Sequence, residues 1–250
     1  MEKQDKQTSY CNCNKKFFAA FILAFGIALG GFFPGYYYYK THINNNSVTV
    51  KGLAEADVVA DLAIWKLKYV ITENDLLTAQ QKITTQTSKI NNFLLKQGFN
   101  EKEIKIERIE TNDLMANPYR SNDANTSRFI LTQTIIVKSN NVALVESSIP
   151  QTDKLIAEGV VFDNNEGYPV SYIFTKLNDI KPKMLAEATQ NAKKAAEEFA
   201  KNSGSLVGKI RRANQGVFSI LPREQTSSGD ETQQINKTVR VVSTVEYWLE

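Results

Sequence analysis

The most distinctive pattern in the chain is one uninterrupted apolar run near its start. From Phe17 to Phe33, seventeen residues carry no charged or strongly polar side chain, and Pro34 and four tyrosines at 36–39 follow. Seventeen helical residues are near the lower limit for crossing a hydrocarbon core of about 30 Å. The tyrosines extend the run with aromatic side chains that favour the headgroup region. The pattern predicts one transmembrane helix over residues 17–39.

Basic residues are distributed unequally on the two sides of this run. Lys40 alone follows it closely, whereas four lysines precede it: Lys3, Lys6, Lys15 and Lys16. The positive-inside rule therefore predicts a cytoplasmic N-terminus and a single-pass protein of the cytoplasmic (inner) membrane. On this interpretation the chain divides into a cytoplasmic tail (1–16), an anchor (17–39), a linker (40–46) and a domain on the periplasmic, extracytoplasmic side (47–250).

Two other interpretations of the apolar run stay open. A cleaved secretory signal also has a basic start and a short apolar segment, and Ala28 and Gly30 supply small residues at a cleavage site. A buried helix of a soluble protein is disfavoured, because the run has no polar side to present to water. We favour the uncleaved anchor because the bulky Phe32 and Phe33 and the tyrosines are typical of a segment that stays in a bilayer.

Small residues recur at a spacing of four within the apolar run. Such spacing lets transmembrane helices approach closely. It is shown by the alanines at 20, 24 and 28 and by two glycine pairs, Gly26 with Gly30 and Gly31 with Gly35. The four glycines are the candidate residues for membrane-helix packing, and they favour a homo-oligomer.

Alternating apolar positions predict strands in the first half of the remaining chain, at 47–52, 58–72, 103–111 and 128–138. A helix is expected between Asn74, a suitable N-cap residue, and Gly98, a suitable residue after the C-cap. Its apolar stripe consists of Leu76, Ala79, Ile83, Ile90 and Leu94. One face of the second strand consists of Ala63, Trp65, Leu67, Tyr69 and Ile71.

The second half repeats this order of elements. After an interrupted helix that restarts near Pro150 and ends at Gly159, we expect a strand around Val170, a helix that starts at Pro182, and strands at 206–212, 216–221 and 237–249. The inner stripe predicted for the long helix is Leu185, Ala188, Ala192, Ala195 and Phe199. The sequence thus predicts an α+β fold of two similar β-α-β-β units, at about 47–139 and 160–250, with mixed or antiparallel sheets and long packed helices.

Charge and cysteine content agree with a division at the membrane. The formal net charge is +3, and residues 1–40, with five lysines and two acidic residues, account for all of it. A charge-balanced domain indicates no nucleic-acid partner. Both cysteines, Cys11 and Cys13, lie in the predicted tail, so the domain has no disulfide. We interpret them as reduced thiols, with acylation or metal binding as alternatives.

Motifs for catalysis are missing from the sequence. It contains no His-Glu-x-x-His, Gly-x-Ser-x-Gly or P-loop pattern, and its one histidine, His42, lies in the linker. Three acidic residues near a strand end, Glu107, Glu110 and Asp113, are the alternative candidates for acid/base chemistry or calcium binding. A basic patch at Lys209, Arg211 and Arg212 and the aromatics Tyr119, Phe218, Tyr247 and Trp248 are candidates for a contact surface or for the core. We therefore assign no catalytic residue, cofactor or metal.

The second half contains the run SYIFTKLNDIKPKMLAEATQNAKKAAEEFAKNSGSLVGKIRRANQGVFSI and ends in KTVRVVSTVEYWLE, and VTVKG stands at 48–52. With these segments the chain resembles the SIMPL domain family (DUF541), in its bacterial membrane-anchored branch. The resemblance implies an exported α+β domain of the cell envelope. It also implies links to oxidative or envelope stress and, in some members, large ring-like assemblies. It implies no agreed enzymatic activity.

Three functions are compatible with these observations. The one we favour is a membrane-anchored, non-enzymatic envelope protein that self-associates or binds an envelope protein partner. The alternatives are an envelope enzyme that uses the carboxylates Glu107, Glu110 and Asp113, and a structural adaptor that spaces the envelope.

Overall fold

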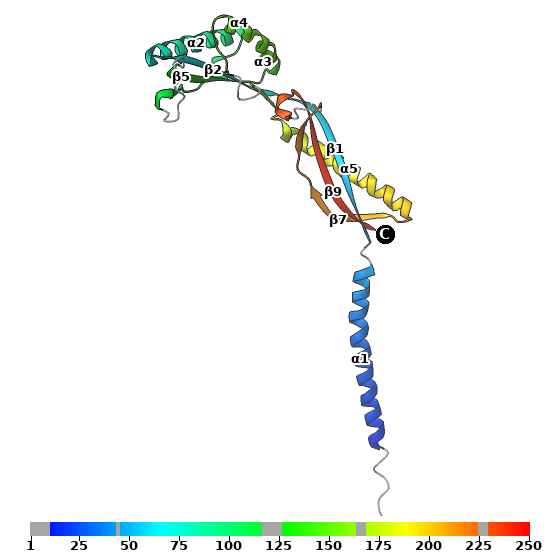
Figure 1. The fold of residues 1–250 in the computed structure, drawn as a ribbon. Coiled ribbons are helices and arrows are strands. Elements are labelled where there is room, and N and C mark those ends of the chain that lie inside the picture. Colours follow the sequence, from blue (N-terminus) through cyan, green and yellow to red (C-terminus); the bar gives the residue numbers. More distant parts are fainter. Residues whose placement is uncertain (1–10, 44–45, 117–126, 164–168, 225–229) are drawn as a thin grey trace, which may run out of the picture. The chain divides into compact units, whose positions relative to one another are not determined.

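The computed structural model describes residues 11–43, 46–116, 127–163, 169–224 and 230–250. The chain begins with helix α1 (Cys11–Ile43), which contains Pro34 and continues past the four tyrosines (Figure 1). Within α1 the candidate span Phe17–Tyr39 contains an 18-residue window with a mean hydropathy of 2.1, and none of that window is buried. By length and composition this helix can cross a membrane, as a span or as a signal anchor.

The rest of the described chain forms an α+β fold with two antiparallel sheets, as predicted. A four-stranded sheet has the order β1-β9-β7, with β8 paired to β9; its strands are β1 (Ser47–Val59), β7 (Val207–Gln215), β8 (Ser219–Pro222) and β9 (Asn236–Leu249). A five-stranded sheet has the order β3-β5-β2-β6, with β4 paired to β5. Its strands are β2 (Leu62–Glu73), β3 (Ile104–Ile106), β4 (Glu110–Asp113), β5 (Phe129–Ser139) and β6 (Val170–Ile173).

The helices between β2 and β6 pack on the five-stranded sheet. Helix α2 (Leu76–Gln97) begins where the carboxylate of Asp75 accepts a hydrogen bond from the Thr78 N–H, and it ends at Gly98, whose φ of 103° is left-handed. Glycine adopts this conformation without steric cost. The predicted end is confirmed, and the cap lies one residue beyond the predicted Asn74. The shorter elements are η1 (Glu101–Glu103), η2 (Leu114–Ala116), α3 (Val142–Ser148), η3 (Ile149–Thr152), α4 (Asp153–Ala157) and η4 (Glu231–Gln233).

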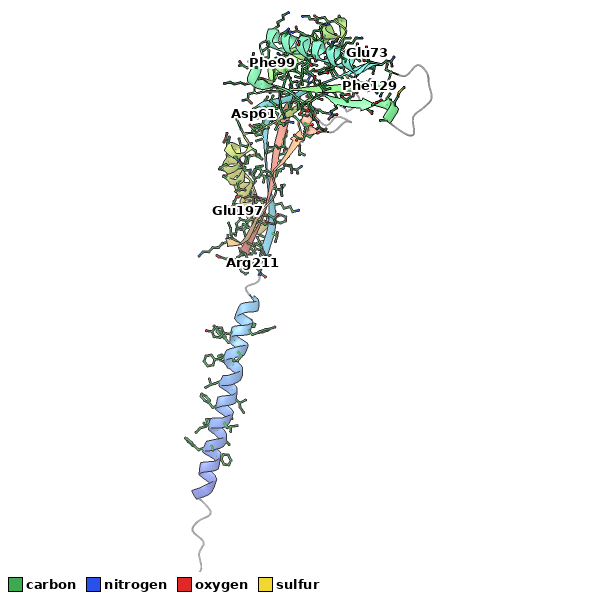
Figure 2. The ribbon with its side chains drawn as sticks, turned by 90° about the vertical axis from the view of Figure 1, so that its left-hand side faces the viewer. Asp61, Glu73, Phe99, Phe129, Glu197 and Arg211 are labelled. Atoms are coloured by element: carbon green, nitrogen blue, oxygen red, sulfur yellow. The ribbon has the colours of Figure 1, made fainter. Side chains whose placement is uncertain are left out.

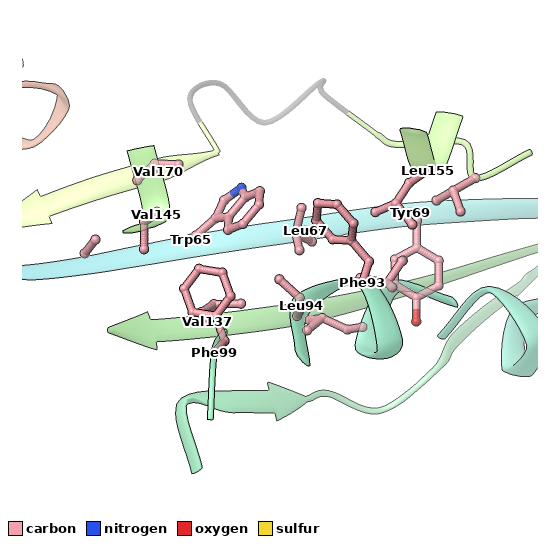
Figure 3. Packing of buried hydrophobic residues seen from close by; sticks show 14 of the residues in the cluster. Trp65, Leu67, Tyr69, Phe93, Leu94, Phe99, Val137, Val145, Leu155 and Val170 are labelled. Atoms are coloured by element: carbon pink, nitrogen blue, oxygen red, sulfur yellow. The ribbon is translucent and has the colours of Figure 1, made fainter. Parts of the chain in front are cut away.

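The core of the five-stranded sheet is built on the alternating face that the sequence predicts. Ala63, Trp65, Leu67, Tyr69 and Ile71 are all buried on β2. On β5, Leu131, Ile135 and Val137 face the same side, with Trp65 opposite Val137 and Leu67 opposite Ile135. Figure 3 shows Trp65 near Phe99, and their ring centroids are 6.3 Å apart. Of the predicted α2 stripe, only Leu76 lies outside this core, at 44% exposure.

Several predicted boundaries differ from the structure. Strand β1 runs on to Val59, through residues 53–57, for which the sequence pattern predicts no strand, and only Ala60 and Asp61 separate it from β2. The strand predicted at 103–111 is two short strands, β3 and β4, which both pair with β5. Helix α5 (Leu177–Ser203) begins five residues before Pro182, the predicted start. A proline in the first turns removes few intrahelical hydrogen bonds, so it does not mark the first residue reliably.

The buried stripe of α5 differs from the predicted one. Its buried residues follow a spacing of four: Met184, Ala188, Ala192, Ala196 and Ala200. Leu185 and Ala195 lie beside this stripe, and Phe199 is 63% exposed, so its predicted burial is wrong. Alanines let the backbone of α5 approach the four-stranded sheet closely. A phenylalanine on that face would increase the distance between helix and sheet.

We expect added volume at the centre of the alanine stripe to destabilise the fold. Ala196→Leu forces three more heavy atoms into a fully buried site and is expected to cost about 1–3 kcal/mol of the free energy of unfolding. Lys194→Leu adds leucine on the exposed side of the same helix and is the matched control. Thermal unfolding followed by circular dichroism measures both, and equal melting temperatures for the two variants would contradict this packing.

The chain clusters into two compact units, one of residues 1–51, 192–214 and 244–250 and the other of residues 52–191 and 215–243. The core of the first unit contains Val50, Ala192, Ala196, Val245 and Tyr247. The second unit contains the core of the five-stranded sheet and a separate cluster of Ala54, Met184, Ala188, Val239 and Val241.

The division into similar units at 47–139 and 160–250 stays a prediction. The strand order of the two sheets shows how the two halves of the sequence are combined. Strand β1 pairs with β9, and β6 pairs with β2, so each half of the sequence contributes a strand to the sheet built mainly by the other half.

Candidate functional site

The second unit contains a cavity of about 550 Å³ beside β2. Its size lies within the range of small-molecule pockets. The walls come from three parts of the chain: residues 65–68 of β2, Thr134 and Ile136 of β5, and a group after α3 made up of Ile149, Thr152, Asp153, Ile156, Phe162, Asp163 and Pro169, with Glu107 at one side.

The cavity exists because β2 loses its neighbour along part of its length. Strand β6 pairs with β2 only between Leu62 and Trp65. Beyond that, the Lys66 N–H donates to the Pro169 carbonyl at 2.7 Å, and the next contact is the bridge between Tyr69 and Phe162. Between these points the Asp163 N–H donates to the Lys68 carbonyl at 2.8 Å, and the cavity lies beside this sparsely bonded stretch of β2.

Charged groups meet at the cavity wall. The Lys68 ammonium lies 3.3 Å from an Asp163 carboxylate oxygen, and both side chains are mostly buried, at 22% and 19% exposure. A second hollow of about 590 Å³ lies on the same sheet and shares Lys68, Glu107 and Thr134 with the first. Lysine ammonium and threonine hydroxyl groups can donate hydrogen bonds to a polar or anionic ligand there.

A buried polar network lies beneath α2. The Tyr69 hydroxyl donates to the Gln133 Oε1 at 2.7 Å and lies 2.7 Å from the Thr87 hydroxyl of α2. The Gln133 Nε2 donates to the Glu107 carbonyl at 2.8 Å. Burial raises the pKa of the Tyr69 hydroxyl, although the hydrogen bond with Thr87 opposes the shift. These hydrogen bonds therefore connect α2 to the segment around Glu107, which lines both hollows.

The three carboxylates singled out from the sequence lie along one edge of the sheet, each beside its own cation. Glu107 is 3.6 Å from Lys105, Glu110 is 3.9 Å from Arg108, and Asp113 is 2.9 Å from Arg128. Within the described ranges no three Asp, Glu, His or Cys residues gather as metal ligands. The structure thus brings these acids to one edge without joining them in a single site.

Asp113 has the strongest of these pairings. Arg128 donates from Nε and Nη2 to both carboxylate oxygens, and its guanidinium lies 4.7 Å from the centre of the Phe129 ring. Figure 2 labels Phe129, the first residue of β5. Hydrogen bonds from Arg128 lower the pKa of Asp113. A lowered pKa stabilises the fold at pH values above the ordinary pKa of aspartate, and this stabilisation is lost as the pH falls through the lowered value.

Replacement of Arg128 tests this assignment. In Arg128→Gln the pKa of Asp113 is expected to rise towards its ordinary value, because the charged donor is gone. Titration of the carboxyl carbon by NMR measures it directly. Lys105→Gln, beside Glu107, is the control and should leave Asp113 unchanged; a value for Asp113 that Arg128→Gln does not move would contradict the pairing.

One residue of the basic patch, Arg211, meets one of the four aromatics, Trp248, in the structure. Arg211 on β7 lies over the Trp248 ring, 4.6 Å from its centre, and donates to the Glu246 carboxylate at 2.8 Å. A hydrogen bond from the Ser47 hydroxyl and the charge of Arg211 lower the pKa of Glu246. Tyr247 is buried in the core, Phe218 is partly buried, and Tyr119 lies outside the described residues.

The sequence pattern did not lead us to predict a buried charge at Lys237. The Lys237 side chain on β9 is fully buried, and its ammonium donates to the Glu231 carboxylate at 3.0 Å and to the Glu231 carbonyl. Lys237 lies on the same alternating face of β9 as the buried Val239 and Val241. This spacing is the feature of the sequence from which its burial could have been predicted.

The four candidate glycines Gly26, Gly30, Gly31 and Gly35 all lie on α1. A Cβ atom at any of them would meet no atom within 4 Å. The described chain therefore leaves that side of the helix free to contact another helix.

The chain is thus an α+β protein with two antiparallel sheets, preceded by a helix that can cross a membrane. The model of the SIMPL family, described as "Protein of unknown function (DUF541)", matches residues 48–247. The chain belongs to this family, and the match covers both sheets and helices α2 to α5. Among curated proteins, no match to the chain is found.

Proposed function

We propose that this protein is a single-pass protein of the cytoplasmic membrane that holds a non-enzymatic SIMPL domain on the extracytoplasmic side, where it self-associates. The observation that carries the proposal is the segment Phe17–Tyr39, which is apolar on every side and has no buried residue in the folded chain. Only a hydrocarbon environment or other helices can cover such a surface.

Self-association is supported by the small residues of α1. The Gly26–Gly30 and Gly31–Gly35 pairs lie four apart, and their open sides admit a second helix at close range. Gly30→Ile is expected to lower the fraction of cross-linked dimer formed by the full chain in lipid bilayers. Phe25→Ile places the same isoleucine on the side of the helix away from the four glycines and is the control. A cross-linked fraction that neither variant changes would contradict the role of the glycines.

A binding role is favoured over catalysis by the carboxylates of the five-stranded sheet. Glu107, Glu110 and Asp113 each neutralise a separate cation, and acid/base catalysis by a pair of carboxylates needs them close to one reacting group. The protein with all three changed to Ala is expected to complement a deletion strain fully. Loss of complementation by a variant that still reaches the membrane would favour the enzymatic alternative.

A further inference from the structure

Four exposed side chains and the half-buried Trp248 lie at one end of the four-stranded sheet. Leu206, between α5 and β7, is 72% exposed, and Phe199 near the end of α5 is 63% exposed. The Arg211 guanidinium lies over the ring of Trp248 on β9. Lys209, also exposed, has no ion-pair partner among the residues the structure describes. We name these five residues the anchor-proximal patch.

Hydrogen bonds place the members of the patch at the same end of the sheet. Leu206 and Glu250 exchange both backbone hydrogen bonds, at 2.8 and 2.9 Å, which brings the start of β7 beside the end of β9. The Ser205 N–H donates to the Ala200 carbonyl, so the chain turns back at the end of α5, close to Phe199. The Leu249 N–H donates to the Asn46 carbonyl, which adds the residue that precedes β1 to this end.

The length of the chain keeps this end near the membrane. Helix α1 continues four residues beyond Tyr39 to Ile43, and three further residues reach Asn46. At 1.5 Å per helical residue and at most about 3.5 Å per extended residue, Asn46 lies within about 16 Å of Tyr39. If the tyrosines lie among the headgroups, the end of the sheet that contains Asn46 is within reach of the membrane surface.

The chemistry of the patch matches that surface. Large apolar side chains rarely gather exposed on a soluble domain unless they contact something. Tryptophan and arginine, which each combine an apolar body with a polar end, are favoured where lipid meets water. Lys209 adds a charge that anionic headgroups attract.

We propose that the anchor-proximal patch rests on the lipid headgroups of the membrane that α1 crosses, with Leu206, Phe199 and Trp248 reaching the boundary of the acyl chains. The inference depends on the proposed function, since it requires α1 to be a membrane span. It adds a second membrane contact, which fixes the orientation of the four-stranded sheet to the bilayer.

Fluorescence of Trp248 tests the proposal. The full chain is reconstituted in vesicles of phosphatidylcholine and phosphatidylglycerol, with or without bromine on the upper acyl positions. The chain has two tryptophans, and Trp65 is buried in the protein core, so subtraction of the spectrum of Trp248→Phe isolates the emission of Trp248. We expect bromine to quench this emission. We expect Leu206→Glu and Phe199→Glu each to reduce the quenching, and Val217→Glu, at an apolar position 86% exposed and outside the patch, to leave it unchanged.

Two results would overturn the proposal. One is Trp248 emission that brominated lipid does not quench, in chains that resist alkaline extraction from the vesicles. The other is emission that depends on the density of protein in the bilayer instead of on bromine, which would show that a second copy covers the patch. If alkali extracts the chain itself, the proposed anchor fails, and that failure is distinguished from failure of the patch.

Discussion

Ala24→Arg is expected to shift the protein from the membrane fraction to the soluble or degraded fraction. Ala24 lies near the middle of the apolar run, and an arginine at the centre of a membrane helix costs about 2.5–3.5 kcal/mol of insertion free energy. That cost lowers the ratio of inserted to non-inserted chains by about two orders of magnitude. Alkaline extraction of membranes followed by immunoblotting measures the distribution.

The matched control places the same charge outside the span. Val217→Arg changes an apolar residue that is 86% exposed and should leave membrane association intact. Retention of Ala24→Arg at the level of the control would contradict the assignment of α1 as the anchor.

Trp65→Ala is expected to have the largest effect on the stability of the domain. The Trp65 side chain is 1% exposed and lies at the centre of the five-stranded sheet, between Val137 of β5 and Phe99. Removal of a buried tryptophan leaves a cavity and costs about 3–5 kcal/mol. For a chain of this size the melting temperature should fall by roughly 6–20 °C.

Leu206→Ala provides the comparison for that measurement. Leu206 is 72% exposed, and surface substitutions of this kind change the free energy of unfolding by about 0.5 kcal/mol or less. Similar melting temperatures for Trp65→Ala and Leu206→Ala, measured by circular dichroism, would contradict the packing of the core.

Local patterns were sufficient to predict much of this fold. The buried face from Ala63 to Ile71 follows from alternation alone, because neighbouring residues of a strand point to opposite sides. The end of α2 at Gly98 follows from the conformational freedom of glycine. The stripe of α5 was not predictable in the same way, because alanine tolerates both buried and exposed positions and Phe199 suggested the wrong face.

The exchange of β1 and β6 between the sheets could not be predicted from local pattern. Pairing of β1 with β9 joins residues almost 200 positions apart, and no short-range feature of SVTVKG specifies its partner. The cavity beside β2 depends on this topology, since it lies along the part of β2 beyond Trp65, which pairs with Val170, the first residue of β6. The network of Tyr69, Thr87 and Gln133 likewise depends on the register of β2 against β5, in which Tyr69 faces Gln133.

In the proposed topology, a single uncleaved span separates a cytoplasmic tail from an external domain. The only cysteines, Cys11 and Cys13, lie on the tail side and report on it directly. In bacterial spheroplasts that express the full chain, a membrane-impermeant maleimide should label neither cysteine until the membrane is permeabilised. A cysteine at the exposed position of Lys102, in a variant without the other two, should be labelled at once. Labelling of Cys11 and Cys13 in intact spheroplasts, or a mature protein that has lost both, would contradict the proposed topology.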